Sequence, residues 1–406
     1  ADAVVNLRFL EERVGDAGLA RRLRGVAAAS WAEIPAETRY RSGVGHVRSP
    51  AAALLEPGVM ANARDAVLQG RALLGRFQQA GVVEYRARPG ALDYARTHWS
   101  RDANGLSAAV VQNLLEAAVF TGDAGLWEEG LRHLRGLGRY AGGVPRGAQT
   151  WEIALHTPDI LASAHLVAAH VLGYEMTGDE TFLGEARYWA WTGVPFVYLR
   201  QPFDGAVGPY ATTPVLGATQ WIAPNWIGLP VQWCGLVYGA ALHRLARHDP
   251  AAPWRRLADG IAASGVLQTY PMSERGRAGL LPDSFTLASQ HRNPADINPA
   301  TLLSTATLLY GAGPLHDFRC SPRDRVGIHA PGEIRALTEP AGGLGFEVVG
   351  WAGSAYRIWL NRVPALAGAR VNGADVALDR ATTYDASQGW LELEASGTAR
   401  VELRYR

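Results

Sequence analysis

The stretch ILASAHLVAAHVLGYEMTGDETFLGEARYWAW, residues 160–191, predicts two helices joined by a tight turn. In its first half, apolar residues recur at the spacing that places them on one helical face. The TGD turn at 177–179 is a short connection between helices, so we expect the pair to form an antiparallel hairpin. The residues Thr157 and Pro158 just before it are typical of a helix N-cap and first helical position.

The hairpin recurs along the chain. TGDAGLW (121–127) joins the preceding pair and ARHDPAAPW (246–254) joins a later one, which gives a loose internal repeat of roughly 55–70 residues. The chain therefore reads as mainly helical up to residue 320. The helices predicted from periodicity cover residues 16–29, 58–80, 105–120, 125–139, 159–176, 180–192, 227–247, 252–265 and 299–311.

The other connections are long and rich in Trp, Tyr, His, Asn, Asp and Pro. In a ring of hairpins the inner helices all run in one direction, so their N-termini share one rim. Loops of this length without secondary structure are uncommon unless they are functional. We therefore expect one mouth of the ring to be built from the segments 80–104, 140–157, 193–226 and 266–298.

The pattern changes to β near the C-terminus. LGFEVVGW (344–351) and AYRIWLNRV (355–363) alternate or run β-rich, and turn signals such as Asn-Gly separate the segments. We predict a helical catalytic domain over 1–322 and a small antiparallel, β-sandwich-like domain over 323–406.

Together these features resemble the six-hairpin (α/α) toroid enzymes of carbohydrate metabolism. The resemblance rests on the hairpins, the TGD-x-x-x-L turns, the Trp-rich loops and the trailing β domain, and it covers about residues 50–320. It implies a mainly α fold, an (α/α)n toroid that is either complete with six hairpins or incomplete, because fewer than twelve helices are recognisable. It also implies a glycoside hydrolase or a polysaccharide lyase with a carbohydrate substrate.

Composition narrows the remaining classes of protein. The chain has 406 residues, 48% of them hydrophobic and 19% charged, with a formal net charge of +1. This near-neutral charge does not indicate nucleic-acid binding, and no apolar run approaches a membrane span. Two cysteines without metal-ligand spacing, and the absence of a dinucleotide fingerprint or P-loop, predict neither a metal nor a cofactor. The chain begins at Ala1 without a signal segment, so we expect a processed, exported protein or a piece of a longer chain. No oligomeric state is indicated.

Glycoside hydrolysis needs two carboxyl groups with separated pKa values. Glu152, flanked by Trp151 and Ile153, is the candidate general acid, and Asp102, beside Arg101, is the candidate that stays ionised and activates water. Asp159 and Asp296 compete for these roles, although Asp159 in a first helical turn also suits the helix dipole. Other rim residues are suited to sugar contacts: Trp99, Trp151, Trp221 and Trp226 for stacking, and Tyr210, Gln220, Asn225 and His291 for hydrogen bonds to hydroxyls.

A lyase would use the same rim differently. It would neutralise a uronate carboxylate with Arg101, Arg292, Asn225 or Asn293, and would abstract the C5 proton with His156, His291 or Tyr210. A third hypothesis is a non-catalytic carbohydrate-binding helical domain, which needs the aromatic faces but no converging carboxylates.

Overall fold

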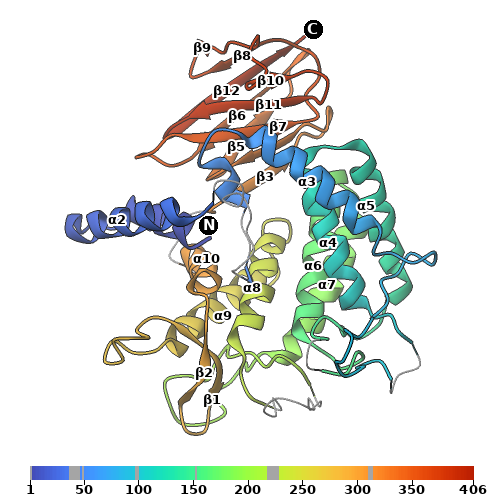
Figure 1. The fold of residues 1–406 in the computed structure, drawn as a ribbon, viewed down its shortest axis with the longest axis vertical. Helices are drawn as coiled ribbons and strands as arrows, with labels where there is room; N and C mark the ends of the chain where they lie inside the picture. Colours follow the sequence, from blue (N-terminus) through green and yellow to red (C-terminus); the bar gives the residue numbers. More distant parts are fainter. Residues whose placement is uncertain are drawn as a thin grey trace. The chain divides into compact units, whose positions relative to one another are not determined.

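The computed structural model of the protein describes residues 2–35, 46–47, 50–96, 100–150, 153–216, 228–309 and 314–406 (Figure 1). The chain divides into two compact units. The helical unit comprises residues 70–116 and 128–309, and the β unit comprises residues 1–69, 117–127 and 310–406. The β unit thus includes N-terminal residues that the sequence assigned to the helical domain.

The predicted helical hairpins are present. Gly178 ends one helix in the left-handed conformation, with φ 73°, and Asp179 caps the next helix by accepting a hydrogen bond from the Thr181 N–H at 2.9 Å. The first TGD turn works in the same way, since Gly122 has φ 67° and Asp123 accepts from the Leu126 N–H. The hairpin helices are α4 (Asn104–Thr121), α5 (Ala124–Gly136), α6 (Ile160–Thr177), α7 (Glu180–Gly193), α8 (Gln232–Ala246) and α9 (Trp254–Gln268), followed by α10 (Pro299–Leu309).

Helix boundaries depart from the prediction at a few places. The helix expected over 58–80 ends at Leu74, and the N-terminal helix α1 was not predicted. Short 3-10 segments follow α5 and α7 and precede α3. The remaining helical elements are α1 (Asp2–Glu11), α2 (Ala17–Glu33), η2 (Pro50–Leu54), α3 (Val59–Leu74), η3 (Leu137–Tyr140) and η4 (Val194–Phe196).

The long connections gather at one end of the helical unit, as expected. Figure 1 shows them at the lower end of the view, where α4, α6 and α8 begin. Hydrogen bonds join each of these rim loops to another, so that the rim is continuous through the described segments. The links are Leu155 N to Tyr94 O, Gly105 N to Arg146 O, Gln149 Nε2 to Pro214 O, Leu216 N to Pro158 O, Val207 N to Gln290 Oε1, and Phe285 N to Pro230 O.

One rim segment contains a β-hairpin that the sequence analysis treated as loop. β1 (Leu281–Thr286) pairs antiparallel with β2 (His291–Ile297). Pro282 and Pro294 interrupt the alternating pattern that marks a strand, and β2 is largely exposed, so the usual signal of a strand is weak here.

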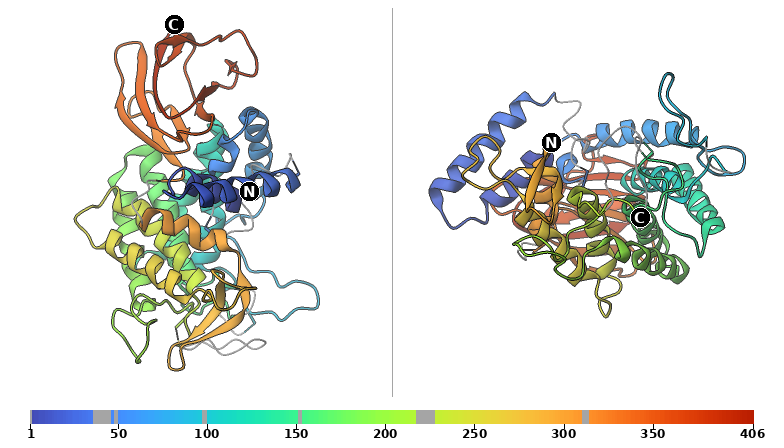
Figure 2. Two further views of the ribbon diagram at one scale, coloured as in Figure 1. Left: turned by 90° about the vertical axis from the view of Figure 1, so that its left-hand side faces the viewer. Right: turned by 90° about the horizontal axis from the view of Figure 1, so that it is seen from below.

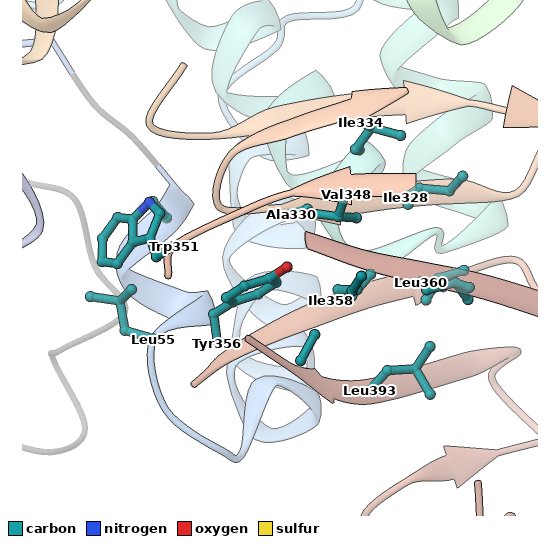
Figure 3. Close-up of a cluster of buried hydrophobic side chains, with 14 of the residues drawn as sticks. Leu55, Ile328, Ala330, Ile334, Val348, Trp351, Tyr356, Ile358, Leu360 and Leu393 are labelled. Carbon is teal, nitrogen blue, oxygen red and sulfur yellow. The ribbon is translucent and has the colours of Figure 1, made fainter. Parts of the chain in front are cut away.

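The β unit contains two antiparallel sheets that share one hydrophobic core. The first has strand order β10-β11-β7-β4-β3 and the second β5-β6-β12-β8-β9. Side chains from both sheets, such as Ile358 and Leu393 from the first and Val348 from the second, enclose the core together with Trp351 (Figure 3). The strands near the C-terminus are seen from the side in the left view of Figure 2. The strands are β3 (Asp317–Cys320), β4 (Gly327–Ala330), β5 (Glu333–Thr338), β6 (Gly343–Val349), β7 (Tyr356–Asn361), β8 (Leu366–Val371), β9 (Ala374–Asp375), β10 (Tyr384–Asp385), β11 (Trp390–Ala395) and β12 (Thr398–Tyr405).

The last turn of α4 belongs to the β unit, where strand side chains satisfy its carbonyl groups. The Trp359 indole donates to the Phe120 carbonyl at 2.7 Å, and the Trp390 indole donates to the Thr121 carbonyl at 2.6 Å. Asn361 Nδ2 donates to the Val119 carbonyl. Two of the many tryptophans are therefore structural, because each buries its ring while its N–H caps a helix end.

Candidate functional site

Asp102 lies in the rim just before α4, at the centre of a hydrogen-bond network. The Tyr140 hydroxyl donates to Asp102 Oδ2 at 2.5 Å, and the Ser100 hydroxyl donates to Oδ1. The backbone at Asp102 forms an antiparallel bridge with Glu84, which fixes the loop that carries it. Asp102 is therefore held in a defined orientation while remaining partly exposed.

This network keeps Asp102 ionised. Partial burial raises the pKa of Asp102, but the hydrogen bonds from Ser100 and Tyr140 outweigh it and, with the charge of Arg139, lower the pKa below 3.8. Burial and the same hydrogen bond raise the pKa of Tyr140, so its hydroxyl stays a donor. The sequence attributed the ionised state of Asp102 to the neighbouring Arg101. In the structure, the hydrogen bonds from Ser100 and Tyr140 favour that state instead.

Two other predicted residues lie around Asp102. His156 Nε2 is 3.1 Å from the Ser100 carbonyl oxygen, so the histidine belongs to the same loop cluster. The Arg101 guanidinium forms an ion pair with Asp93 at 3.2 Å and also donates to the Tyr85 carbonyl. Through these two contacts Arg101 stabilises the conformation of the loop.

Asp159 is the N-cap of α6 and is almost completely buried. Its Oδ1 accepts from the Ala162 N–H at 2.7 Å, and its Oδ2 accepts from the Ala148 N–H at 3.0 Å. The predicted cap at Thr157 and Pro158 is wrong, because the helix begins at Ile160. Asp159 occupies the N-cap position because its buried carboxylate accepts two backbone hydrogen bonds at once.

Burial gives Asp159 a pKa shift opposite to that of Asp102. Desolvation raises the pKa of Asp159 to about 6, although backbone N–H groups and the Gln149 side chain lower it in part. The carboxyl group is therefore protonated in a substantial fraction of molecules near pH 6.

The two carboxylates precede helices whose first turns touch. A Cβ on Gly105 of α4 would lie 2.4 Å from the Ala162 Cβ of α6, so the close approach requires glycine. One loop segment also joins the two helix starts. Arg146 N donates to Asn104 Oδ1 at 2.9 Å, and Ala148, two residues on, donates to Asp159.

Gly105→Ala tests this close approach. We expect it to lower the free energy of unfolding by about 1–3 kcal/mol, because the added methyl group meets Ala162 Cβ and the Arg146 carbonyl oxygen. Thermal unfolding measures the effect. Gly136→Ala is the matched control, since its Cβ would meet nothing within 4 Å, and an equal loss in both variants would contradict the close approach.

The other predicted site residues that the structure describes are not in the cluster around Asp102 and Asp159. Tyr210 has φ 61°, its ring packs against Gly260 of α9, and its carbonyl accepts from Gln232. Arg292 donates to the carbonyl groups of residues 267–269 at the end of α9. Asp296 forms an ion pair with Arg277 at 3.5 Å. His291 is exposed at the start of β2, and Asn293 donates to Ser284 and Thr286 within the hairpin.

Several predicted site residues lie outside the described residues. They are Trp99, Trp151, Glu152, Gln220, Trp221, Asn225 and Trp226.

Sequence analysis missed Ser100 and Tyr140. Tyr140 ends the 3-10 segment after α5, 38 residues from Asp102, and no local pattern links the two. It also gave no role to Asp283, which lies in the rim segment 266–298. Burial raises the pKa of Asp283, while a hydrogen bond from Trp233 at the start of α8 lowers it in part.

The described segments lack both a metal-binding cluster and a membrane-spanning helix. They contain no group of three or more His, Cys, Asp or Glu side chains placed to hold a metal ion. They also contain no helix with the length and apolar character needed to cross a membrane.

No protein-family model and no curated protein matches the sequence. Among solved structures, the chain is similar to an unsaturated glucuronyl hydrolase from Bacillus sp. GL1, responsible for the degradation of glycosaminoglycan. The identity is 15% over 75% of this chain and 84% of that chain, with a TM-score of 0.45. A GH127 β-arabinofuranosidase is 12% identical over 86% and 68%, with a TM-score of 0.37. Endoglucanase CelQ from Clostridium thermocellum is 10% identical over 86% and 79%, with a TM-score of 0.29.

All three TM-scores lie below 0.5, so these similarities assign neither a family nor an activity to the chain. The similar structures are carbohydrate-active enzymes, the class that the sequence resembles, and no single family is specified.

Proposed function

We propose that the protein is a glycoside hydrolase that cleaves a poly- or oligosaccharide at the rim of its helical unit. The observation that carries this proposal is a pair of carboxyl groups, Asp102 and Asp159, placed before two helices whose first turns touch. Their surroundings shift their pKa values in opposite directions. Such a separation is what assigns one carboxyl group as acid and the other as base.

In this mechanism Asp159 donates its proton to the glycosidic oxygen as the bond to the anomeric carbon breaks, and because its carboxyl group is buried, the step requires the rim loops to expose it when the substrate binds. Asp102, ionised, accepts a proton from the water molecule that attacks that carbon. Inversion would require the carboxyl groups to stand roughly 6.5–9.5 Å apart. Glu152 remains the competing general acid that the sequence favours.

The partners of the rim arginines favour hydrolysis over lyase chemistry. A lyase needs a cationic or amide group that neutralises the substrate carboxylate. Arg101 is paired with Asp93, and Arg292 is bound to the carbonyl groups at the end of α9. Each guanidinium group therefore already has partners within the protein, which makes it a poor candidate to neutralise a substrate carboxylate.

A screen of neutral and uronic-acid polysaccharides tests the reaction class. New reducing ends should appear without the ultraviolet absorbance of a C4–C5 double bond. Both signals together would mean β-elimination and would overturn the hydrolase proposal. Binding without either signal would favour a non-catalytic carbohydrate-binding domain.

Tyr140→Phe tests the role of Asp102 as the ionised partner. Loss of the hydroxyl donor should raise the pKa of Asp102 and move the acid limb of the pH–rate profile upward by about one pH unit. Activity on the screened substrate, measured between pH 3 and pH 8, reports this change. Tyr188→Phe is the control, because the hydroxyl of Tyr188, an exposed residue of α7, donates to the Gly143 carbonyl and not to a carboxylate. An unmoved acid limb in Tyr140→Phe would contradict the assignment.

A further inference from the structure

The β unit contains a cavity of about 760 Å³, separate from the rim. It lies between the start of α3 and the strands β7 and β11, beside the segment that follows β9. Its volume falls within the range of about 300–1,000 Å³ that is usual for small-molecule sites. All of its lining residues belong to the β unit.

Arginines and carboxylates both line this cavity. Arg357, whose side chain is only 16% exposed, forms an ion pair with Glu394 and lies 3.9 Å from Glu392. Glu392 is buried and accepts a hydrogen bond from the Gly58 N–H at the start of α3. The Arg64 side chain, which also lines the cavity, lies over the Trp390 ring.

The formal charges of the lining cancel. Three arginines, Arg64, Arg357 and Arg380, stand against three carboxylates, Asp375, Glu392 and Glu394. An anionic ligand would be opposed by the carboxylates and a cationic one by the arginines. The remaining N–H groups and lone pairs therefore suit a neutral ligand with many hydrogen-bonding groups.

The rest of the lining contains both apolar and hydroxyl groups. The partly exposed Val371 and Val376 provide surfaces for C–H groups, and Thr382 and Thr383 add hydroxyls. A sugar ring has this dual character, with hydroxyls at its edge and C–H groups on its faces.

We propose that this cavity of the β unit is a second saccharide-binding site, which takes a neutral, hydroxyl-rich sugar unit. The inference goes beyond the proposed hydrolase activity and does not depend on it. A neutral ligand held here would keep a glycan on the protein without taking part in bond cleavage.

Calorimetric titration with cellotetraose, mannotetraose and xylotetraose tests the site. The full chain carries Asp159→Asn, so that the probe is not consumed. Ala377→Trp, at an exposed lining position, is added to fill the cavity without removing a packed group. Ala365→Trp, exposed on the same unit but outside the lining, is the matched control.

We expect at least one tetrasaccharide to bind, and Ala377→Trp to weaken that binding at least ten-fold while Ala365→Trp leaves it unchanged. Equal binding by the two variants, or no binding of any neutral tetrasaccharide, would overturn the site. Without Asp159→Asn, Ala377→Trp should retain hydrolysis of a short substrate. Hydrolysis with unaltered binding refutes the site alone, and cavity-dependent binding without hydrolysis refutes the proposed function alone.

Discussion

Asp159→Asn is expected to lower the rate of glycan hydrolysis by about 10²–10⁴-fold, the usual contribution of general acid catalysis. The amide cannot donate a proton to the leaving oxygen, while it has nearly the same shape as the carboxyl group. Reducing-end release, measured with the substrate found in the screen, reports the loss. The unsubstituted enzyme should lose activity as pH rises through about 6, because Asp159 ionises there.

The fold of this variant should persist. Asn retains an acceptor for the Ala162 N–H and so keeps the helix cap. Its Nδ2 then faces the Ala148 N–H, which we expect to cost about 1–2 kcal/mol of stability. Far-ultraviolet circular dichroism and thermal unfolding separate this modest loss from the large loss of activity.

Asp179→Asn is the matched control, because Asp179 caps the neighbouring helix α7 in the same way at an exposed position. It should leave the rate unchanged. If Asp159→Asn behaves like Asp179→Asn, Asp159 is a helix cap alone. A large loss of activity in Glu152→Gln, with the fold intact, would then assign the general acid to Glu152.

The helical part of the fold was predictable because its signals are local. Apolar periodicity and the TGD turns lie within about 30 residues of each other, and they placed α4 to α9 within a few residues. The β1–β2 hairpin was missed because its prolines and exposed strand remove the alternating pattern. A cap at Thr157 was equally favoured by local chemistry, and only tertiary burial selects Asp159.

The candidate site was predictable as a region and only partly as a set of contacts. Long loops before the inner helices indicated the rim, and Asp102, His156 and Asp159 were chosen from it. The partners of these residues come from distant segments. Tyr140 reaches Asp102 from the end of the α5 hairpin, and no spacing rule encodes such a contact. Arg101 was predicted to bind the substrate, but its guanidinium forms an ion pair with Asp93 of the same loop.

Glu175→Gln is expected to produce the largest loss of stability. The side chain of Glu175 on α6 is only 5% exposed, and its carboxylate binds Arg244 of α8 at 2.9 Å and His248 at 2.9 Å. Burial would raise the pKa of Glu175, but the charge of Arg244 and the hydrogen bonds from both partners lower it to about 2. Relative to the ordinary value of 4.5, this shift corresponds to about 3 kcal/mol of stability.

The depressed pKa of Glu175 determines how its contribution to stability changes with pH. A carboxyl group whose folded pKa is depressed stabilises the fold above its unfolded pKa of about 4.5, and the contribution is lost as pH falls toward about 2. Urea unfolding followed by tryptophan fluorescence should therefore show Glu175→Gln less stable by about 3 kcal/mol at pH 7, and by less at pH 3. The exposed Glu128→Gln on α5 is the control and should match the unsubstituted protein at both pH values.

Loss of this buried ion pair would also affect the candidate site. Glu175 joins α6 to α8 near the ends opposite the rim, and these two inner helices position the loops that hold Asp159 and Tyr210. If Glu175→Gln has the same pH dependence of stability as the unsubstituted protein, Glu175 has the same pKa in the folded and unfolded states, and the ion pair does not stabilise the fold. Packing alone, such as the contact of Gly193 with Tyr238, would then have to hold the hairpins in place.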